Sequence, residues 1–427
     1  MKQTLVISCP ASSRSGYGDH SRDIVRSLIA MDKFAISIMD QRWGNCPRTA
    51  LDNDVELSNL LLPQGPMTQQ PDIWIQVTVP NEFQPVGKFN IGITAGIETD
   101  RVSLEWIHGM NKMDINIVPS QHSKVVFEQT SYDKKDANDN VVETITCKTP
   151  IHVLFEGLDT SIFDKNESAS FAGIDNVRES FCFLVVAHWL NGNLTHDRKD
   201  LGGTVQTFLH SFKGSGPKPA MILKTSSATF SVSDREQVLA RVKDIQNSCG
   251  IPLDRQPSIY ILHGDLTPEQ MNGLYNHKKV KAMLSLTHGE GYGRPLQEFS
   301  VTGKPTLATN WSGHTDFLGN YTFKIPGELK EVDKSAQVEN VIIEGSRWFY
   351  ADYGYASKLI QDIYSKYKSH LPKSRKQRKF IKDNFSLDAM IEEFTRLMHE
   401  EVLANIPEPV KLKLPKLKLP KLERVHE

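Results

Sequence analysis

The chain has 427 residues, of which 39% are hydrophobic and 24% charged, and its formal net charge is −1 at pH 7. This length predicts two or three domains with separate cores, and the near-neutral charge excludes a whole-protein attraction to nucleic acid or anionic membranes. There is no signal-peptide-like apolar stretch at the N-terminus and no run of about 18 apolar residues. Five scattered cysteines without CxxC spacing indicate reduced thiols, so we expect a cytoplasmic protein.

The first part of the chain alternates apolar runs of strand length with helical patterns. Strands are predicted at 4–9, 34–40, 72–77, 89–94 and 115–119. Helices are predicted from an N-cap at Asp19 to about Ala30, near 101–112 and near 120–130. This alternation predicts a parallel, doubly wound α/β sheet, which binds ligands at the carboxyl ends of its strands.

Several polar or glycine residues follow these strands and are candidate site residues. They are Arg14, Gly16 and Gly18 in the loop after the first strand, and Asn81, Glu98, Asp100 and His122 after later strands. Arg14 and the last four are candidates for the acceptor side of the cleft, although each of the last four also suits helix capping or solvation. The two glycines also suit a simple tight turn.

Asp52-Asn-Asp54 matches the Asp-x-Asp pattern that holds a divalent ion in metal-dependent glycosyltransferases of the GT-A type. It lies in a polar stretch with no apolar strand leading into it, so the pattern favours a turn. We assign no metal.

A second strand–helix series follows an apolar strand that opens residues 151–165 and a linker expected near 157–178. Its strands are predicted at 181–189, 220–226, 258–266 and 282–286, and its helices from about 201, at 233–247 and from Thr267. We therefore expect an N-terminal Rossmann-like domain over 1–165 and a C-terminal Rossmann-like domain over 166–345. Helices at 346–404 and a Lys/Leu/Pro tail at 405–427 would follow.

The most informative stretch is 281–318, in which an apolar strand ends in H-G-E-G-Y-G-R-P and a helix is predicted from about Arg294 to Thr302. Glycines at 289, 291 and 293 allow close approach of a ligand, and a helix N-terminus offers N–H groups to a phosphate. Glu290 and Glu298 flank this turn with seven residues between them. Carboxylates accept hydrogen bonds from vicinal hydroxyls, so the pattern predicts a site for a sugar phosphate, although an ordinary loop with two solvated glutamates is the alternative.

Glu-x7-Glu in this context resembles the signature of retaining glycosyltransferases with the GT-B fold, glycosyltransferase family 4. The resemblance covers roughly residues 3–400 and implies two Rossmann-like domains facing a cleft. It implies that Glu290 contacts the donor sugar and Glu298 the ribose of the nucleotide. The remaining donor-binding candidates in this stretch are Gly289, Gly291, Tyr292, Gly293 and Arg294.

In that family an Arg and a Lys neutralise the donor diphosphate. Lys199 matches the Lys, whereas the expected Arg is unmatched, so His188 or Arg198 is its substitute, helped by Lys224. Gly264 to Leu266 should lie by the nucleotide base, and Arg14, Gly16 and Gly18 should face the donor across the cleft. Cations directly before a helix oppose its dipole, which also favours an anion-binding role for Arg198 and Lys199.

The implied activity is sugar transfer, with retention of configuration, from a nucleotide-diphosphate sugar to a hydroxyl acceptor, without a further cofactor. A glycan, a lipid-linked sugar or a small molecule is the expected acceptor. One alternative is glycosylation of hydroxymethylated bases in DNA, which would require base flipping. Another is a non-catalytic sugar-nucleotide-binding scaffold.

The C-terminal part is predicted to be helical over 346–404, with Trp348 to Tyr364 returning to the N-terminal domain. The segment 366–382 is strongly basic, and the tail repeats KLKLP. Proline every five residues prevents a helix in the tail. Both segments are candidates to contact an anionic partner, although a basic run is more often a solvated helix face.

Overall fold

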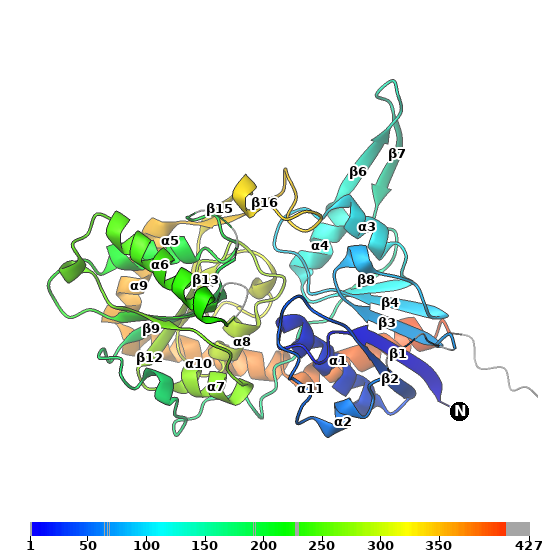
Figure 1. Cartoon of the computed structure of the whole chain (residues 1–427), viewed down its shortest axis with the longest axis horizontal. Helices are drawn as coiled ribbons and strands as arrows, with labels where there is room; N and C mark the ends of the chain where they lie inside the picture. Colours follow the sequence, from blue (N-terminus) through cyan, green and yellow to red (C-terminus); the bar gives the residue numbers. More distant parts are fainter. Residues whose placement is uncertain are drawn as a thin grey trace, which may run out of the picture.

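The computed structural model describes residues 2–406 except 64, 66, 68, 191, 193 and 227–229. Two lobes, each with a six-stranded sheet, lie side by side, and C-terminal helices run along both of them (Figure 1). None of the helices in this part of the chain has the combined length and apolar character that a bilayer span requires. The tail from residue 407 onward, for which we predicted an anionic partner, lies outside the described residues.

The first sheet is parallel throughout, with the strand order β2-β1-β3-β4-β5-β8. Its strands are β1 (Gln3–Cys9), β2 (Phe34–Asp40), β3 (Ile73–Val77), β4 (Phe89–Ile93), β5 (Ile115–Val118) and β8 (Ile151–Val153). Both faces are covered, as parallel sheets require. In β3, Ile73 and Ile75 join one core cluster and Trp74 joins another on the opposite face.

The second sheet is also parallel and has the order β11-β10-β9-β12-β13-β14. Its strands are β9 (Cys182–His188), β10 (Ala220–Ser226), β11 (Ile259–Leu262), β12 (Val280–Ser285), β13 (Thr306–Thr309) and β14 (Phe323–Ile325). Phe183 and Leu184 of β9 enter different core clusters, so this sheet is covered on both faces as well. The expected pair of doubly wound domains is confirmed.

Helices connect the strands of both sheets. In the first lobe they are α1 (Gly16–Met31), α2 (Val55–Ser58), α3 (Leu104–Met110) and α4 (Gln121–Gln129). In the second lobe they are α5 (Leu201–Ser211), α6 (Val232–Ser248), α7 (Pro268–Asn276) and α8 (Arg294–Ser300). The predicted N-cap of α7, Thr267, forms a full capping box with Gln270.

The predicted N-cap of α1 was wrong by four residues. Ser15 is the cap, because its extended backbone lets its side chain accept a hydrogen bond from the Gly18 N–H. Asp19 lies in the first turn and pairs with Arg22. The glycine-rich loop is therefore shorter than expected, and Gly16 is the first residue of the helix.

The predicted helical return at Trp348 to Tyr364 was also wrong. Trp348 belongs to β16 (Arg347–Ala351), which pairs with β15 (Gly327–Glu331), and α9 (Tyr353–Ser365) packs on the core of the second lobe. After α10 (Tyr367–Asn384), α11 (Leu387–Leu397) and a π-helical turn (Met398–Leu403) return to the first lobe. Met390 and Phe394 of α11 are fully buried there among residues of β1 and α1.

The sequence analysis did not identify the β-hairpin of β6 (Ser131–Lys135) and β7 (Val141–Thr146), which projects from the first lobe (Figure 1). Its side chains are mostly exposed, so it lacks the alternating apolar pattern that marks a half-buried strand.

Candidate functional site

The candidate site lies where the strand order of the second sheet reverses. β9 is the central strand, with β10 on one side and β12 on the other. The loop after β9 carries Arg198 and Lys199, and the loop after β12 carries Glu290. Open α/β sheets bind ligands in the crevice at such a switch point, outside the carboxyl ends of the strands.

Four charged residues, which we call the Glu290 cluster, converge at this point: Glu98, Arg198, Lys199 and Glu290. The Lys199 ammonium donates hydrogen bonds to both carboxylate oxygens of Glu290. Arg198 Nη1 lies 3.6 Å from Glu290 Oε2 and 3.1 Å from Glu98 Oε1. Glu98 comes from the first lobe, so the cluster spans the two lobes.

The backbone holds Glu290 in this position. Its N–H donates to Ser312 Oγ at 2.9 Å, and its carbonyl accepts from the Gly313 N–H at 2.9 Å. Ser312 has a positive φ of 75°. The sequence analysis missed Ser312 because a serine after a strand carries no distinctive pattern.

Two aspartates explain why cations can precede α5. Asp200 is the N-cap and accepts from the Gly203 N–H, while Asp197 Oδ2 accepts from the Leu201 N–H. These side chains accept hydrogen bonds from the first N–H groups of the helix, a role that the donor-only Arg198 and Lys199 cannot fill. The cations are left to pair with the glutamates of the Glu290 cluster.

The electrostatics favour the ionised forms of Glu290 and Arg198. Burial raises the pKa of the Glu290 carboxyl, but Lys199 and Arg198 outweigh burial and hold this pKa below its ordinary value. Burial lowers the pKa of Lys199, an effect that Glu290 opposes. For Arg198, the two glutamates outweigh burial and raise the pKa. An anion that approached would therefore meet charged partners.

His188 and Lys224 lie at the same edge of the sheet. Burial, together with the nearby Lys199, Lys224 and Arg198, lowers the pKa of His188 to about 4, so this histidine is neutral at pH 7 and lies among cations. Its Nδ1 is 2.9 Å from Ser226 Oγ. Lys224 Nζ donates to the Gly264 carbonyl at 2.8 Å. These predicted residues are brought together with Arg198 and Lys199.

Gly289 and Gly291 are needed where the two lobes touch. A Cβ atom on Gly289 would lie 2.0 Å from the Glu98 carbonyl oxygen, and one on Gly291 would lie 2.0 Å from that of Ala95. Ser120 Oγ of the first lobe also donates to the Gly291 carbonyl at 2.8 Å. We expected these glycines to admit a ligand, whereas in this structure they admit the backbone of the opposite lobe.

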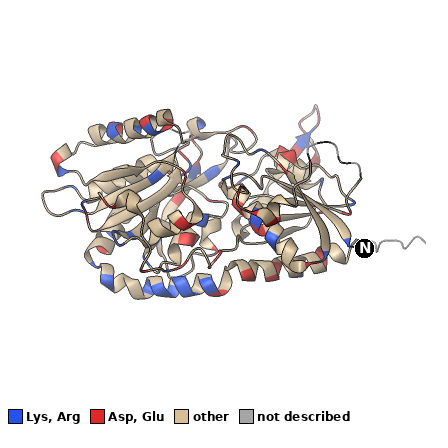
Figure 2. Ribbon diagram, turned by 60° about the horizontal axis from the view of Figure 1, so that its bottom comes forward, with Lys and Arg blue, Asp and Glu red and all other residues tan. Residues whose placement is uncertain are grey.

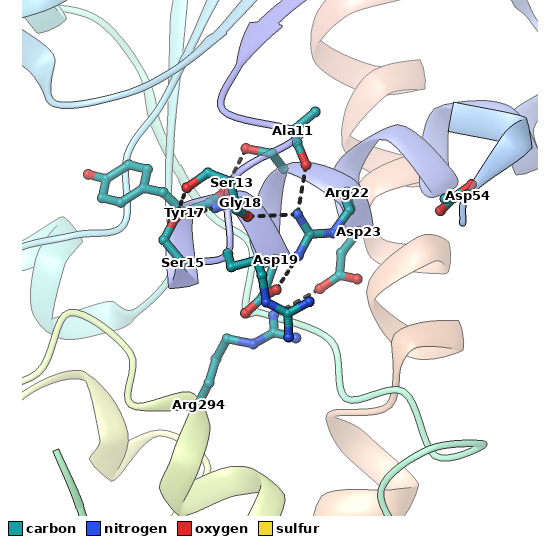
Figure 3. Close-up of polar contacts among 12 residues, drawn as sticks. Ala11, Ser13, Ser15, Tyr17, Gly18, Asp19, Arg22, Asp23, Asp54 and Arg294 are labelled. Atoms are coloured by element: carbon teal, nitrogen blue, oxygen red, sulfur yellow. Dashed lines mark hydrogen bonds and ion pairs between the residues drawn. The ribbon is translucent and has the colours of Figure 1, made fainter. Parts of the chain in front are cut away.

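A second interlobe group, the Arg294 cluster, consists of Asp23, Glu156, Arg294 and Glu298. Arg294 Nη1 lies 2.8 Å from Asp23 Oδ2 (Figure 3). It also lies 3.3 Å from Glu156 Oε2. Glu298 Oε2 accepts a hydrogen bond from the Tyr275 hydroxyl at 2.9 Å. We predicted Arg294 as a donor-binding residue, and its guanidinium here faces the carboxylates of α1 and of the segment after β8.

Three carboxylates surround one guanidinium in the Arg294 cluster. Burial raises the pKa of Glu156 and of Glu298 to about 7 each, although Arg294 opposes the shift. The pKa of Asp23 is also raised by burial, again against Arg294. The sequence analysis missed Asp23 and Glu156. Asp23 lies on a helix face and Glu156 in a connecting segment, so only the folded chain brings them to Arg294.

The other predicted donor-side residues are placed around the lobe interface. Tyr292 is buried and donates its hydroxyl proton to the Glu156 carbonyl at 2.9 Å, so its side chain serves packing. Gly293 caps α8 with a φ of 104°. Arg14 reaches across the lobes to pair with Asp265 and donates to the Leu266 carbonyl at 3.2 Å.

Gly16 and Gly18 differ in their surroundings at the start of α1. A Cβ atom on Gly16 would meet nothing within 4 Å, whereas one on Gly18 would lie 2.1 Å from the Ser13 carbonyl oxygen. Gly16 is therefore open, and Gly18 serves the tight turn that we considered as an alternative.

Of the residues predicted to face an acceptor, only Glu98 joins the Glu290 cluster. Asp100 pairs with Arg347 of the second lobe, with Oδ2 2.7 Å from Nε. The His122 ring packs edge-on against Trp311 at 4.7 Å, and burial lowers its pKa to about 4. Asn81 is exposed in a 3-10 turn after β3 that packs against α3.

The Asp-x-Asp pattern forms a turn before α2. Asp54 caps that helix by accepting from the Leu57 N–H, and it pairs with Arg26 at 2.8 Å. Within the described residues, no group of three or more His, Cys, Asp or Glu side chains is arranged to hold a metal ion.

The predicted basic segment forms most of α10, which lies along one edge of the molecule (Figure 2). Arg378 and Lys382 pair with Asp164 at 2.7 and 2.6 Å, so part of this charge anchors the helix. Lys368, Arg375 and Lys376 are exposed. A separate cavity of about 710 Å³ lies over β1 and β2, and its lining shares no residue with the Glu290 cluster.

Neither a protein-family model nor a curated protein sequence matches this chain. Solved structures do share its fold. Sucrose-phosphate synthase from Thermosynechococcus elongatus superposes with a TM-score of 0.63 at 12% identity, over 93% of this chain and 98% of that one. A glycosyltransferase from Rickettsia africae gives 0.62 at 15% identity, over 94% and 99%.

A third match is HepE from Anabaena in complex with UDP-glucose, with a TM-score of 0.56 at 11% identity, over 93% of this chain and 99% of that one. At these identities the likeness shows the fold alone. The chain has the GT-B architecture of two Rossmann-like sheets with C-terminal helices, as the resemblance of its motifs implied.

Proposed function

We propose that this protein is a retaining glycosyltransferase that moves a sugar from a nucleotide-diphosphate sugar to a hydroxyl acceptor. The convergence of Arg198 and Lys199 on Glu290, at the switch point of the second sheet, carries the proposal. In this scheme residues 166–345 bind the donor and residues 1–165 bind the acceptor.

The proposed chemistry depends on charge stabilisation of the leaving diphosphate. Lys199, Arg198 and Lys224 would bind its oxygens through charge-assisted hydrogen bonds. Lys199 is paired with Glu290 in this structure, so the diphosphate would take over Lys199 and free Glu290 to accept hydrogen bonds from the sugar hydroxyls. Glu298 would accept from the ribose hydroxyls.

The acceptor would be activated by the leaving group itself. In the usual account of retaining enzymes of this type, the departing phosphate deprotonates the acceptor hydroxyl on the same face of the sugar. The main contribution of the protein is then to position donor and acceptor. His188 fits a neutral hydrogen-bonding role, because burial and the surrounding cations lower its pKa to about 4.

The DNA alternative has less support. Its motivation was the basic segment 366–382 together with the lysine-rich tail. Arg378 and Lys382 of the segment are engaged by Asp164, and the tail from residue 407 lies outside the described residues. The scaffold alternative has to explain why two cations and a glutamate are kept together and buried at the switch point, which costs desolvation free energy. We therefore favour a glycan, a lipid-linked sugar or a small hydroxylated molecule as acceptor.

The test is donor binding and slow donor hydrolysis over a panel of nucleotide sugars. UDP-glucose comes first, because HepE was solved in complex with it. Calorimetry should detect binding of one donor, and nucleoside diphosphate release should be lost in Glu290→Ala and Lys199→Ala. If the wild-type protein binds no donor, the proposal is wrong, whereas donor binding without any turnover would favour the scaffold alternative.

A further inference from the structure

Trp43 forms an aromatic surface at the carboxyl edge of the first sheet. It lies in the loop after β2 and stacks on Tyr17 of α1, with ring centroids 4.1 Å apart and planes inclined by 30°. Trp43 is only partly buried, and no described residue accepts a hydrogen bond from its indole N–H. A ring that is stacked on one face and partly open can offer the remaining surface to a ligand.

The Tyr17 ring beneath Trp43 is held firmly. Its hydroxyl is 3.0 Å from Thr94 Oγ1 and accepts a hydrogen bond from the Ala95 N–H at 3.1 Å. Burial raises the pKa of this hydroxyl to about 12, so it stays protonated. Trp43 therefore stacks on a support that belongs to the sheet edge itself.

The loop that carries Trp43 is also tied down. The Gln41 N–H donates to the Cys9 carbonyl, and the Ala50 N–H donates to the Ser12 carbonyl. The Arg14 N–H donates to the Pro47 carbonyl at 2.9 Å. These bonds fix both ends of the loop against the segment between β1 and α1, so the aromatic ring is presented by a pre-organised backbone.

A series of contacts links Trp43 to the Glu290 cluster. Tyr17 contacts Ala95, and the Ala95 carbonyl is so near to Gly291 that a Cβ atom there would lie 2.0 Å from it. Gly291 directly follows Glu290. Tyr17, Ala95 and Gly291 thus connect Trp43 to the residue expected to hold the donor sugar.

We propose that Trp43 is the platform on which a neutral sugar ring of the acceptor stacks; this inference rests on the proposed function. The apolar C–H face of a pyranose suits an aromatic plane, and its hydroxyls can donate to nearby carboxylates. Glu98 and Glu156 are the carboxyl groups on the Tyr17 side of this platform, and they pair with Arg198 and Arg294 respectively.

The surrounding charges disfavour a nucleic acid at the same place. Single-stranded nucleic acids also stack on aromatic rings, but they need a groove of unpaired cations that follows the phosphates. Of the arginines in this loop or bonded to it, Arg14 is paired with Asp265 and Arg48 with Asp40. Arg42 alone is exposed and has no acidic partner among the described residues.

The first measurement uses ¹⁹F NMR of the full chain labelled with 5-fluorotryptophan. The Trp43 signal is assigned by its loss in Trp43→Phe. Maltose, cellobiose, lactose, methyl α-mannoside and a short oligothymidylate are each added with UDP. At least one sugar should shift the Trp43 signal and leave that of buried Trp106 unchanged. The inference is overturned if no sugar shifts it, or if the oligothymidylate does so and the sugars do not.

The second measurement is the transfer reaction with the sugar that shifts the signal. Trp43→Ala should raise the acceptor KM about tenfold, the loss expected for one stacking contact, and leave the donor KM within about twofold. Trp43→Phe should be intermediate, and Tyr355→Ala, which removes an exposed aromatic ring on α9, should match the wild type.

The readouts separate the possible failures. If Trp43 merely covers Tyr17, Trp43→Ala should lower the melting temperature and slow donor hydrolysis while leaving the acceptor KM unchanged, and the platform is then refuted. Failure of the proposed function is seen independently, as absence of nucleotide-sugar binding by the wild-type protein in calorimetry.

Discussion

The Glu290 cluster and the Arg294 cluster both join the two lobes, yet their charges are balanced in opposite ways. The first has two cations and two carboxylates, with Lys224 nearby, and the pKa of Glu290 is held low. The second has one guanidinium and three carboxylates, and the pKa values of Glu156 and Glu298 are about 7.

This difference separates two kinds of ionic contact. A cluster with matched or excess cations stays ionised and responds to an added anion, as a diphosphate site must. A buried cluster with excess carboxylates holds protons near neutral pH, so its strength varies with pH. We therefore expect the Glu290 cluster to determine catalytic activity and the Arg294 cluster to determine how stably the two lobes pack against each other.

The largest effect is expected from Arg294→Met, which leaves three buried carboxylates without their cation. The free energy of unfolding should fall by about 3–5 kcal/mol at pH 8. The loss should be smaller at pH 5, because Glu156 and Glu298 are then protonated. Urea denaturation at both pH values measures it, with exposed Arg255→Met as the control. An equal loss of free energy at both pH values would contradict the inference that Glu156 and Glu298 are protonated at pH 5 and ionised at pH 8.

Lys199→Ala should reduce donor turnover by about 10²- to 10³-fold, the effect of removing one charge-stabilising group. It should also destabilise the fold, because Glu290 stays buried with one cation fewer. Lys199→Met combined with Glu290→Gln should recover stability but not turnover, which distinguishes lost catalysis from misfolding. Exposed Lys213→Ala is the matched control, and turnover within twofold of wild type for Lys199→Ala would refute the role.

Glu156→Gln should flatten the pH dependence of stability. The folded pKa of about 7 lies above the ordinary value of 4.5, so the folded state binds more protons between these pH values. The contribution of Glu156 to the free energy of unfolding is therefore fully present below about pH 4.5, and it is lost as the pH rises through 7. The variant should lose about 1–3 kcal/mol less than the wild type between pH 5 and 8. If urea denaturation gives parallel stability–pH profiles for the wild type and the variant between pH 5 and 8, Glu156 is ionised over that whole range and the prediction is wrong.

The smallest effect is expected from neutralising the exposed face of α10 with Lys368→Gln, Arg375→Gln and Lys376→Gln together. These side chains lie outside both clusters, so stability should change by less than about 0.5 kcal/mol per site. Donor turnover should stay the same, and DNA binding at physiological salt should be absent in wild type and variant. Salt-sensitive DNA binding by the wild type that the variant loses would revive the DNA alternative.

Local sequence patterns predicted most of the fold. Buried parallel strands such as β3 are continuous apolar runs, and the capping box at Thr267 marks a helix start, because both signals depend on neighbours in the chain. Short exposed elements escaped prediction. The β6–β7 hairpin and β16 lack a long apolar pattern. Trp348 to Tyr364 was predicted as one helix that returns to the first lobe, whereas it contains strand β16 followed by helix α9, which packs on the second lobe.

The sequence by itself made Glu290, Arg198 and Lys199 candidate site residues, through a glycine-rich turn, cations before a helix and the resemblance to glycosyltransferase family 4. Only the tertiary structure showed that Glu98 completes their cluster, that Gly289 and Gly291 are needed for contact between lobes, and that Asp23 and Glu156 surround Arg294. It also placed Trp43 on Tyr17. These partners lie far apart in the chain, and their free energy of interaction arises only when the two sheets are brought together.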